Sequence, residues 1–106
     1  MSILADIQEA IAQQRYRVTG HAASELAQDR IDEIELLAAT RNAEVIEDYP
    51  ALKPCPACLV LGHANPGQPI HAVWAYAATD ARAILVTAYR PDPELWSKDF
   101  RQRVNR

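Results

Sequence analysis

The sequence predicts an α+β fold in which helices come first and an antiparallel sheet follows. Apolar residues recur at helical spacing up to about residue 42 and then change to an extended, alternating pattern. Short turns separate the later segments, which is typical of antiparallel strands. About half of the 106 residues are apolar, so we expect one domain, residues 1–106, with a single core.

Two helices are predicted before residue 31. Ser2 can cap the first, which should end near 13–15, where apolar residues at helical spacing stop. Thr19 can cap the second, over 21–30. Between them, residues 16–18 have the composition of a minor strand or an extended link.

The third helix, over 32–40, has the clearest start signal in the chain. Asp32 as N-cap and Glu35 at the third helical position form a capping box. Ile31 and Leu36 flank it as a hydrophobic staple. The apolar face should continue through three further residues, Ile34, Leu37 and Ala38.

Four strands are predicted after residue 42, and each is bounded by turn residues. The last three should be sequential neighbours in one antiparallel sheet, because tight turns join them. The N-terminal helices should pack on one face of that sheet. The predicted strands are 44–49, 58–64, 70–77 and 82–90.

A short C-terminal helix is predicted after the last strand. Asp92 can cap it, and Pro93 suits the first helical position. Trp96 and Phe100 lie four residues apart and would then share one helix face.

Charge and hydropathy limit the classes of function. The net charge of −3 counts against tight binding of nucleic acid, which usually needs a basic footprint. No apolar run approaches the roughly 20 residues of a membrane helix, and the N-terminus shows no secretory signal. We therefore expect a cytoplasmic protein without membrane contact. The basic residues that could contact RNA lie mainly near the C-terminus: Lys98, Arg101, Arg103 and Arg106, with Arg82 and Arg90.

The two cysteines, Cys55 and Cys58, form a C-x-x-C pair that allows three interpretations. They could be a redox pair, or half of a zinc site completed by His63 and His71. The favoured interpretation is that they pack as small hydrophobic residues, since a lone C-x-x-C is a weak signal. We therefore expect no bound metal, no cofactor and no disulfide.

Four residues are candidates for catalysis. His21 begins the second helix, where a neutral imidazole could act as a general base. His71, Tyr89 and Arg90 lie on adjacent predicted strands and could bind and polarise a phosphate, as in a metal-independent ribonuclease. Tyr89 and Arg90 should point to opposite faces, so only one can join His71, and Arg90 is preferred because it stays ionised.

A structural role is the alternative for these residues, and spacing alone favours it. In that interpretation the sheet face is exposed, and Arg90 pairs with Asp92 or Asp99.

Several segments in this order resemble the domain of unknown function 4258 family over about residues 16–103. They are His21-Ala22, Glu44-Val45-Ile46-Glu47-Asp48-Tyr49-Pro50, Pro56-Ala57-Cys58-Leu59-Val60-Leu61-Gly62, Pro69-Ile70-His71-Ala72-Val73-Trp74, and Thr87-Ala88-Tyr89-Arg90-Pro91-Asp92-Pro93-Glu94-Leu95-Trp96. The family in turn resembles the RelE/ParE-like, MqsR-type toxins. His21, His71, Tyr89 and Arg90 fall inside these segments.

The resemblance implies a RelE-like fold and a toxin-like protein of a type II toxin–antitoxin pair. It also implies mRNA endoribonuclease activity, with RNA and a small zinc-finger antitoxin-like protein as partners. The chain departs from many relatives at Glu25 and Asp29, where they carry basic residues. Two other functions stay open: a non-catalytic protein-binding module on the same fold, and a small zinc or thiol protein that uses the C-x-x-C.

Overall fold

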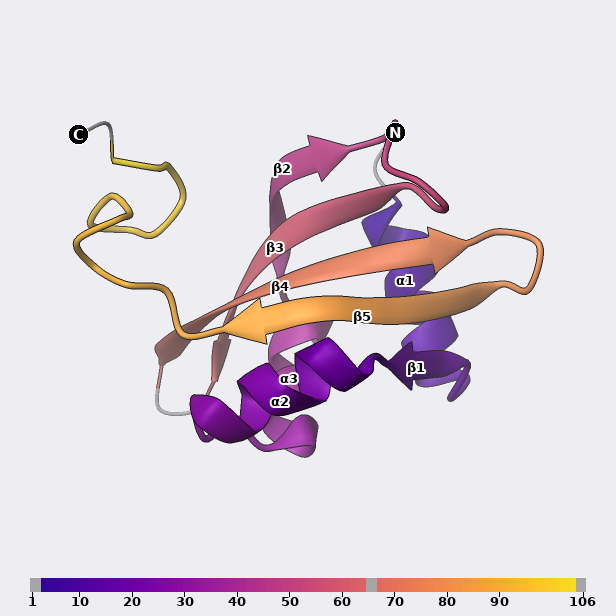
Figure 1. Ribbon diagram of the computed structural model, residues 1–106, viewed down its shortest axis with the longest axis horizontal. Helices are drawn as coiled ribbons and strands as arrows, with labels where there is room; N and C mark the ends of the chain where they lie inside the picture. Colours follow the sequence, from indigo (N-terminus) through magenta and orange to yellow (C-terminus); the bar gives the residue numbers. More distant parts are fainter. Residues whose placement is uncertain (1–2, 65–66, 105–106) are drawn as a thin grey trace.

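The computed structural model describes residues 3–64 and 67–104, and it confirms the α+β class. Within these residues, three helices cover one five-stranded mixed sheet (Figure 1). The helices are α1 (Leu4–Ala12), α2 (Gly20–Gln28) and α3 (Glu33–Arg41). The strands are β1 (Tyr16–Val18), β2 (Glu44–Tyr49), β3 (Ala57–Ala64), β4 (Gln68–Ala77) and β5 (Arg82–Tyr89).

The sheet has the order β1-β5-β4-β3-β2. As predicted, β3, β4 and β5 are sequential antiparallel neighbours, and β2 pairs antiparallel with β3. The predicted sheet of four strands is incomplete, because the segment predicted as a minor strand or extended link forms β1, a fifth strand parallel to β5. The pairing continues past β1, where the Thr19 N–H donates to the Leu85 carbonyl at 3.2 Å. Turn signals report only pairing between chain neighbours, so they could not reveal this contact.

The three helices share one core with the inner face of the sheet. Ile7 of α1, Leu26 of α2 and Leu36 of α3 are buried against this face, which centres on Trp74. Gly62 lets α3 approach β3 closely, because a Cβ there would overlap the carbonyl of Ala39. The helices therefore leave the opposite, outer face of the sheet to other segments.

The predicted caps of α2 and α3 are confirmed. Thr19 caps α2, since its hydroxyl accepts from the Ala22 N–H at 3.1 Å. Asp32 and Glu35 form the predicted capping box of α3. The predicted cap Ser2 lies outside the described residues.

The predicted inward face of α3 is wrong. Its buried residues are Leu36, Ala39 and Thr40, whereas Ile34 is 75% exposed. Leu36, Ala39 and Thr40 follow i, i+3, i+4 spacing and form one stripe along the helix, and only one stripe can face the sheet. The stripe that contains Ala39 faces the sheet because Ala39 lies against Gly62. Leu37 lies at the border of this stripe, half-buried.

The predicted C-terminal helix is also wrong. Within the described residues 91–104 the chain forms turns and an isolated bridge between Trp96 and Arg103. The Asp92 carboxylate accepts from the Glu94 N–H at 2.9 Å, and such local side-chain bonds compete with a helix. In the structure, Trp96 is 5% exposed and packs against His71 on the outer face of the sheet. Figure 1 shows this segment in yellow, extending from the end of β5.

None of the helices in the described part of the chain is both long and apolar enough to span a membrane.

Candidate functional site

His71 and Tyr89 lie side by side on the outer face of the sheet. They are direct cross-strand partners on β4 and β5, so both side chains point to the same face. His71 Nδ1 is 3.3 Å from the Tyr89 hydroxyl, and the two rings meet edge to face at 5.4 Å. Tyr89, rather than Arg90, therefore accompanies His71.

The C-terminal segment covers His71 completely. His71 Nε2 lies 2.9 Å from the Phe100 carbonyl oxygen, which can only accept, so Nε2 carries the proton. In the neutral ring Nδ1 then accepts from Tyr89. The Trp96 ring packs edge to face on His71 at 4.3 Å, and His71 has no exposed surface.

An ion pair between Arg103 and Glu47 lies beside His71 and Tyr89 on the outer face. Arg103 binds both carboxylate oxygens of Glu47, at 2.8 and 3.1 Å, and Tyr49 donates to the same carboxylate. The Arg103 guanidinium also lies 4.8 Å from the centre of the Trp96 ring, which links it to the histidine. We call the six residues the outer cluster: Glu47, Tyr49, His71, Tyr89, Trp96 and Arg103.

The environment sets the charges of the outer cluster. Burial lowers the pKa of His71, although the Phe100 carbonyl and Glu47 act against it. The hydrogen bond from Arg103 lowers the pKa of Glu47. Burial raises the pKa of Tyr89. The cluster therefore holds a neutral imidazole beside an ionised carboxylate, a guanidinium and a protonated phenol.

The lowered pKa of His71 predicts a pH-dependent stability. The unfolded chain takes up the imidazole proton near the ordinary pKa of 6.5, and the folded protein only at lower pH. The contribution of His71 to the free energy of unfolding is therefore fully present above the ordinary pKa of 6.5. It is lost as the pH falls toward the lower pKa of His71 in the folded protein. The slope cannot exceed about 1.4 kcal/mol per pH unit for one group.

Urea unfolding of the wild type and of His71→Gln, followed from about pH 7.5 to about pH 5.5, measures this effect. The variant should show a flatter dependence, because it has no imidazole to protonate. An equal pH dependence in both proteins would contradict the assignment to His71.

Arg90 lies outside the outer cluster and is held by α2 and α3. Its backbone N–H donates to the Asp29 carboxylate at 2.8 Å, and its side chain donates to the carbonyls of Asp29 and Arg30. Glu35 lies 3.6 Å from the guanidinium. The structure thus gives Arg90 a role in joining β5 to the helices, with partners other than the expected Asp92 or Asp99.

His21 also stands apart from His71. Its side chain is 69% exposed in the first turn of α2, and Nε2 lies 3.1 Å from the Glu25 carboxylate. Glu25 in addition accepts from the Thr87 hydroxyl on β5. His21 therefore contacts the sheet through Glu25, at the β5 edge beside Tyr89, and not through His71.

The geometry of the cysteines favours packing. Both are free thiols, and Cys58 is fully buried in the helix-side core. Burial raises the pKa of Cys58 to about 11, so the thiolate that redox chemistry and zinc binding need is scarce. In residues 3–64 and 67–104, no three His, Cys, Asp or Glu side chains converge as metal ligands would.

Sequence reasoning missed four members of the outer cluster. Glu47 and Tyr49 could have been found, since residues two apart on a strand point to one face. Trp96 and Arg103 carried no such signal, because their positions depend on how the irregular C-terminal segment folds back over the sheet.

Comparison with known proteins identifies the family. A family model described as domain of unknown function (DUF4258) matches residues 18–90, which is more than half of the chain. This range includes the four outer-cluster residues on strands and ends before Trp96 and Arg103. No curated protein and no solved structure matches the chain. The chain therefore belongs to the domain of unknown function 4258 family.

Proposed function

We propose that this protein is a toxin-like mRNA endoribonuclease of a type II toxin–antitoxin pair, with a RelE-like fold. In this proposal, it cleaves RNA through the outer cluster without a metal ion. The supporting observation is that a neutral imidazole, a guanidinium, a carboxylate and two phenols converge on one face of the sheet.

Each group suits one part of RNA cleavage. When the Tyr89 hydroxyl turns from His71 Nδ1 to the substrate, that nitrogen, which carries no proton, can take the proton of a 2′-hydroxyl as that oxygen attacks the adjacent phosphorus. Arg103 can stabilise the negative charge that develops on the phosphate oxygens. The phenol of Tyr89 can donate a proton to the departing 5′-oxygen. The bond from phosphorus to that oxygen breaks, which leaves a cyclic phosphate and a free 5′-hydroxyl.

RNA can reach His71 only when the C-terminal segment moves. Trp96 and the Phe100 carbonyl cover the imidazole. The segment is tied to β2 by two ion pairs, Arg101 with Glu44 and Arg103 with Glu47. The first is exposed on both sides, and such pairs contribute little to stability. When the segment lifts, Arg103 can exchange the Glu47 carboxylate for a phosphate.

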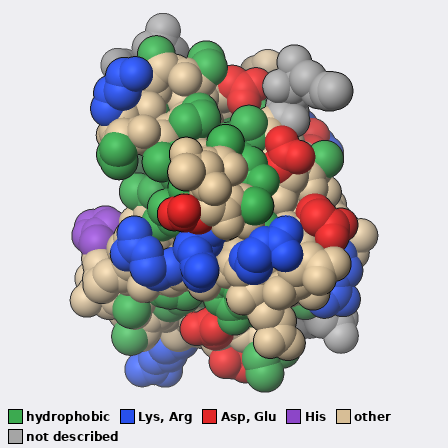
Figure 2. All heavy atoms as spheres, turned by 90° about the vertical axis from the view of Figure 1, so that its right-hand side faces the viewer, with side chains coloured by type: hydrophobic (Ala, Val, Ile, Leu, Met, Phe, Trp, Pro, Cys, Tyr) green, Lys and Arg blue, Asp and Glu red, His purple; other side chains and the backbone are tan. Residues whose placement is uncertain are grey.

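The surface offers a place for the RNA backbone, although the chain is acidic overall. Figure 2 shows Lys and Arg side chains in a row across the end of the molecule that lies at the right of Figure 1. The β4–β5 turn and β1 lie at this end, opposite the C-terminal segment. A single strand that starts at the outer cluster and runs along β5 would reach this row, where phosphates can bind.

A small zinc-finger antitoxin-like protein is the partner that this proposal includes. Its support is the family resemblance, together with the family membership of residues 18–90.

One observation favours a second candidate, a non-catalytic protein-binding module. His71 is fully buried, and both of its ring nitrogens have hydrogen-bond partners, as a structural histidine would. In that case the outer cluster only fastens the C-terminal segment to the sheet.

Incubation of the purified protein with messenger RNA in the presence of EDTA distinguishes the two functions. The ribonuclease should produce fragments with cyclic phosphate ends, and overexpression should arrest growth. His71→Gln should lose both effects, provided that its melting temperature shows a folded protein. If the wild type neither cleaves RNA nor arrests growth, the binding-module function replaces the proposal.

A further inference from the structure

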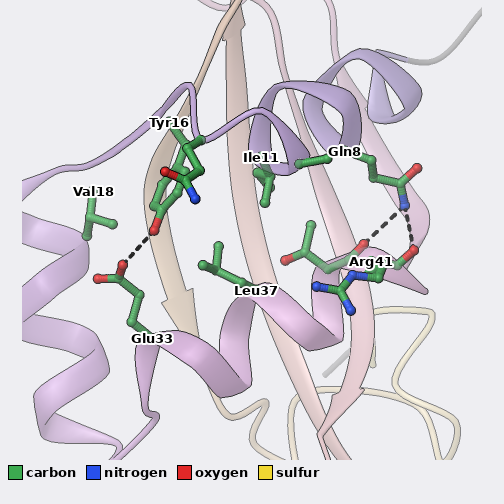
Figure 3. Close-up of a pocket in the computed structure, with 10 residues that line it drawn as sticks. Gln8, Ile11, Tyr16, Val18, Glu33, Leu37 and Arg41 are labelled. Carbon is green, nitrogen blue, oxygen red and sulfur yellow. Dashed lines mark hydrogen bonds between the residues drawn. The ribbon is translucent and has the colours of Figure 1, made fainter.

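A hollow lies between α1, β1 and α3, on the helix side of the sheet and away from the outer cluster. It has a volume of about 820 Å³ and opens to solvent along one side (Figure 3). We propose that this groove binds an amphipathic helix of a partner protein. The proposal does not depend on ribonuclease activity.

The groove runs along the whole of α3. Its α3 wall consists of Glu33, Leu37, Thr40 and Arg41, which follow one helix face. Gln8, Ile11 and Ala12 form the α1 wall in the same way. Arg41 lies eight positions after Glu33 on α3, which corresponds to about 12 Å along the helix axis. The groove thus has the length of about two helical turns.

Hydrogen bonds fix both ends of the groove. At one end the Tyr16 hydroxyl donates to the Glu33 carboxylate at 2.8 Å. At the other end the Gln8 amide donates to the carbonyls of Thr40 and Arg41, both at 3.1 Å. Figure 3 shows these contacts joining α3 to β1 at one end and to α1 at the other. The groove is therefore preformed, which reduces the entropy that a ligand must lose on binding.

The floor of the groove and its rim are apolar. Ile11 and Leu37 line the space between the two polar ends, and Val18 extends the apolar lining beyond the Tyr16–Glu33 hydrogen bond (Figure 3). Ile34 lies one turn before Leu37 on α3 and is 75% exposed. An apolar surface that continues outside the hollow fits the stripe of a helix better than a small molecule that would be enclosed.

The charges at the two ends specify the partner. Glu33 carries a carboxylate and Arg41 a guanidinium, and neither forms an ion pair with another described residue. A helix antiparallel to α3 would place its last turn at Glu33 and its first turn at Arg41. Basic residues in the last turn and acidic residues in the first also suit that helix's own dipole. The partner helix should therefore begin acidic and end basic.

Two synthetic peptides of about 15 residues test the proposal. Both carry leucines at i, i+3, i+4 and i+7. One has Glu in the first turn and Lys in the last, and the other has these charges exchanged. Fluorescence anisotropy should show that the wild type binds the first peptide about tenfold more tightly, a difference of about 1.4 kcal/mol.

The charge-exchanged protein, Glu33→Lys with Arg41→Glu, should reverse this preference. Leu37→Asp should abolish binding, whereas Leu95→Asp, at an exposed leucine outside the groove, should leave it unchanged. Circular dichroism and melting temperature establish that each variant is folded. Absence of binding of either peptide to the wild type, equal affinity for both, or no reversal in the exchanged protein would overturn the proposal. None of these outcomes bears on RNA cleavage, so the two proposals fail separately.

Discussion

Arg103→Ala is expected to reduce the proposed RNA cleavage by about 10²–10³-fold, as removal of one preorganised donor to a transition-state charge typically does. Arg103 is the guanidinium of the outer cluster, since it lies 4.8 Å from the centre of the Trp96 ring that packs on His71. Its side chain is 62% exposed, so its removal should leave the fold intact.

Arg101→Ala is the matched control. Arg101 lies on the same segment, and it also pairs with a glutamate of β2, Glu44 at 2.6 Å. Both substitutions remove one positive charge and one tie between the segment and the sheet. Trp96, however, stacks with Arg103. Arg101→Ala should therefore cleave RNA at a rate close to that of the wild type.

Single-turnover cleavage measures both variants under conditions in which binding is saturated. A similar loss in both would mean that total charge or attachment of the segment matters, rather than a placed guanidinium. An unchanged rate in Arg103→Ala would remove this residue from the site, even if the wild type is a ribonuclease.

Trp74→Ala is expected to lower the free energy of unfolding by about 3–5 kcal/mol, the usual range for a fully buried tryptophan. The side chain has no exposed surface and lies at the centre of the core between the sheet and the helices. Its indole N–H donates to the Thr40 hydroxyl at 3.2 Å, and that hydroxyl donates to the Leu36 carbonyl at 3.0 Å. Because domains of this size are stable by only about 5–15 kcal/mol, the variant should be close to unfolding.

Trp74→Phe separates the hydrogen bond from the packing. It keeps most of the apolar volume, and it removes the donor to Thr40. In urea unfolding, Trp74→Phe should therefore lower the free energy of unfolding by much less than Trp74→Ala does. Equal losses would assign the stability to the hydrogen bond, and a loss of less than about 1 kcal/mol in Trp74→Ala would contradict the central position of this residue.

The sequence alone determined the elements whose signals are local. The capping box of Asp32 and Glu35 and the Thr19 cap act within one helical turn, so they could be read without knowledge of the fold. The strands 58–64, 70–77 and 82–90 pair through short connections, so their order also followed from the chain. His71 and Tyr89 were both predicted as candidates because they lie on such neighbouring strands.

The tertiary structure alone decided the features that join distant parts of the chain. β1 pairs in parallel with β5, a strand far along the chain. Ile34 of α3 is exposed because the close approach of Ala39 to Gly62 orients the helix. The C-terminal segment is irregular rather than helical, and it buries Trp96 on His71 and places Arg103 beside Glu47. Capping and turn signals depend on residues that are neighbours in the sequence. Burial of apolar surface depends on which distant surfaces meet in the fold, and a local sequence pattern does not contain that information.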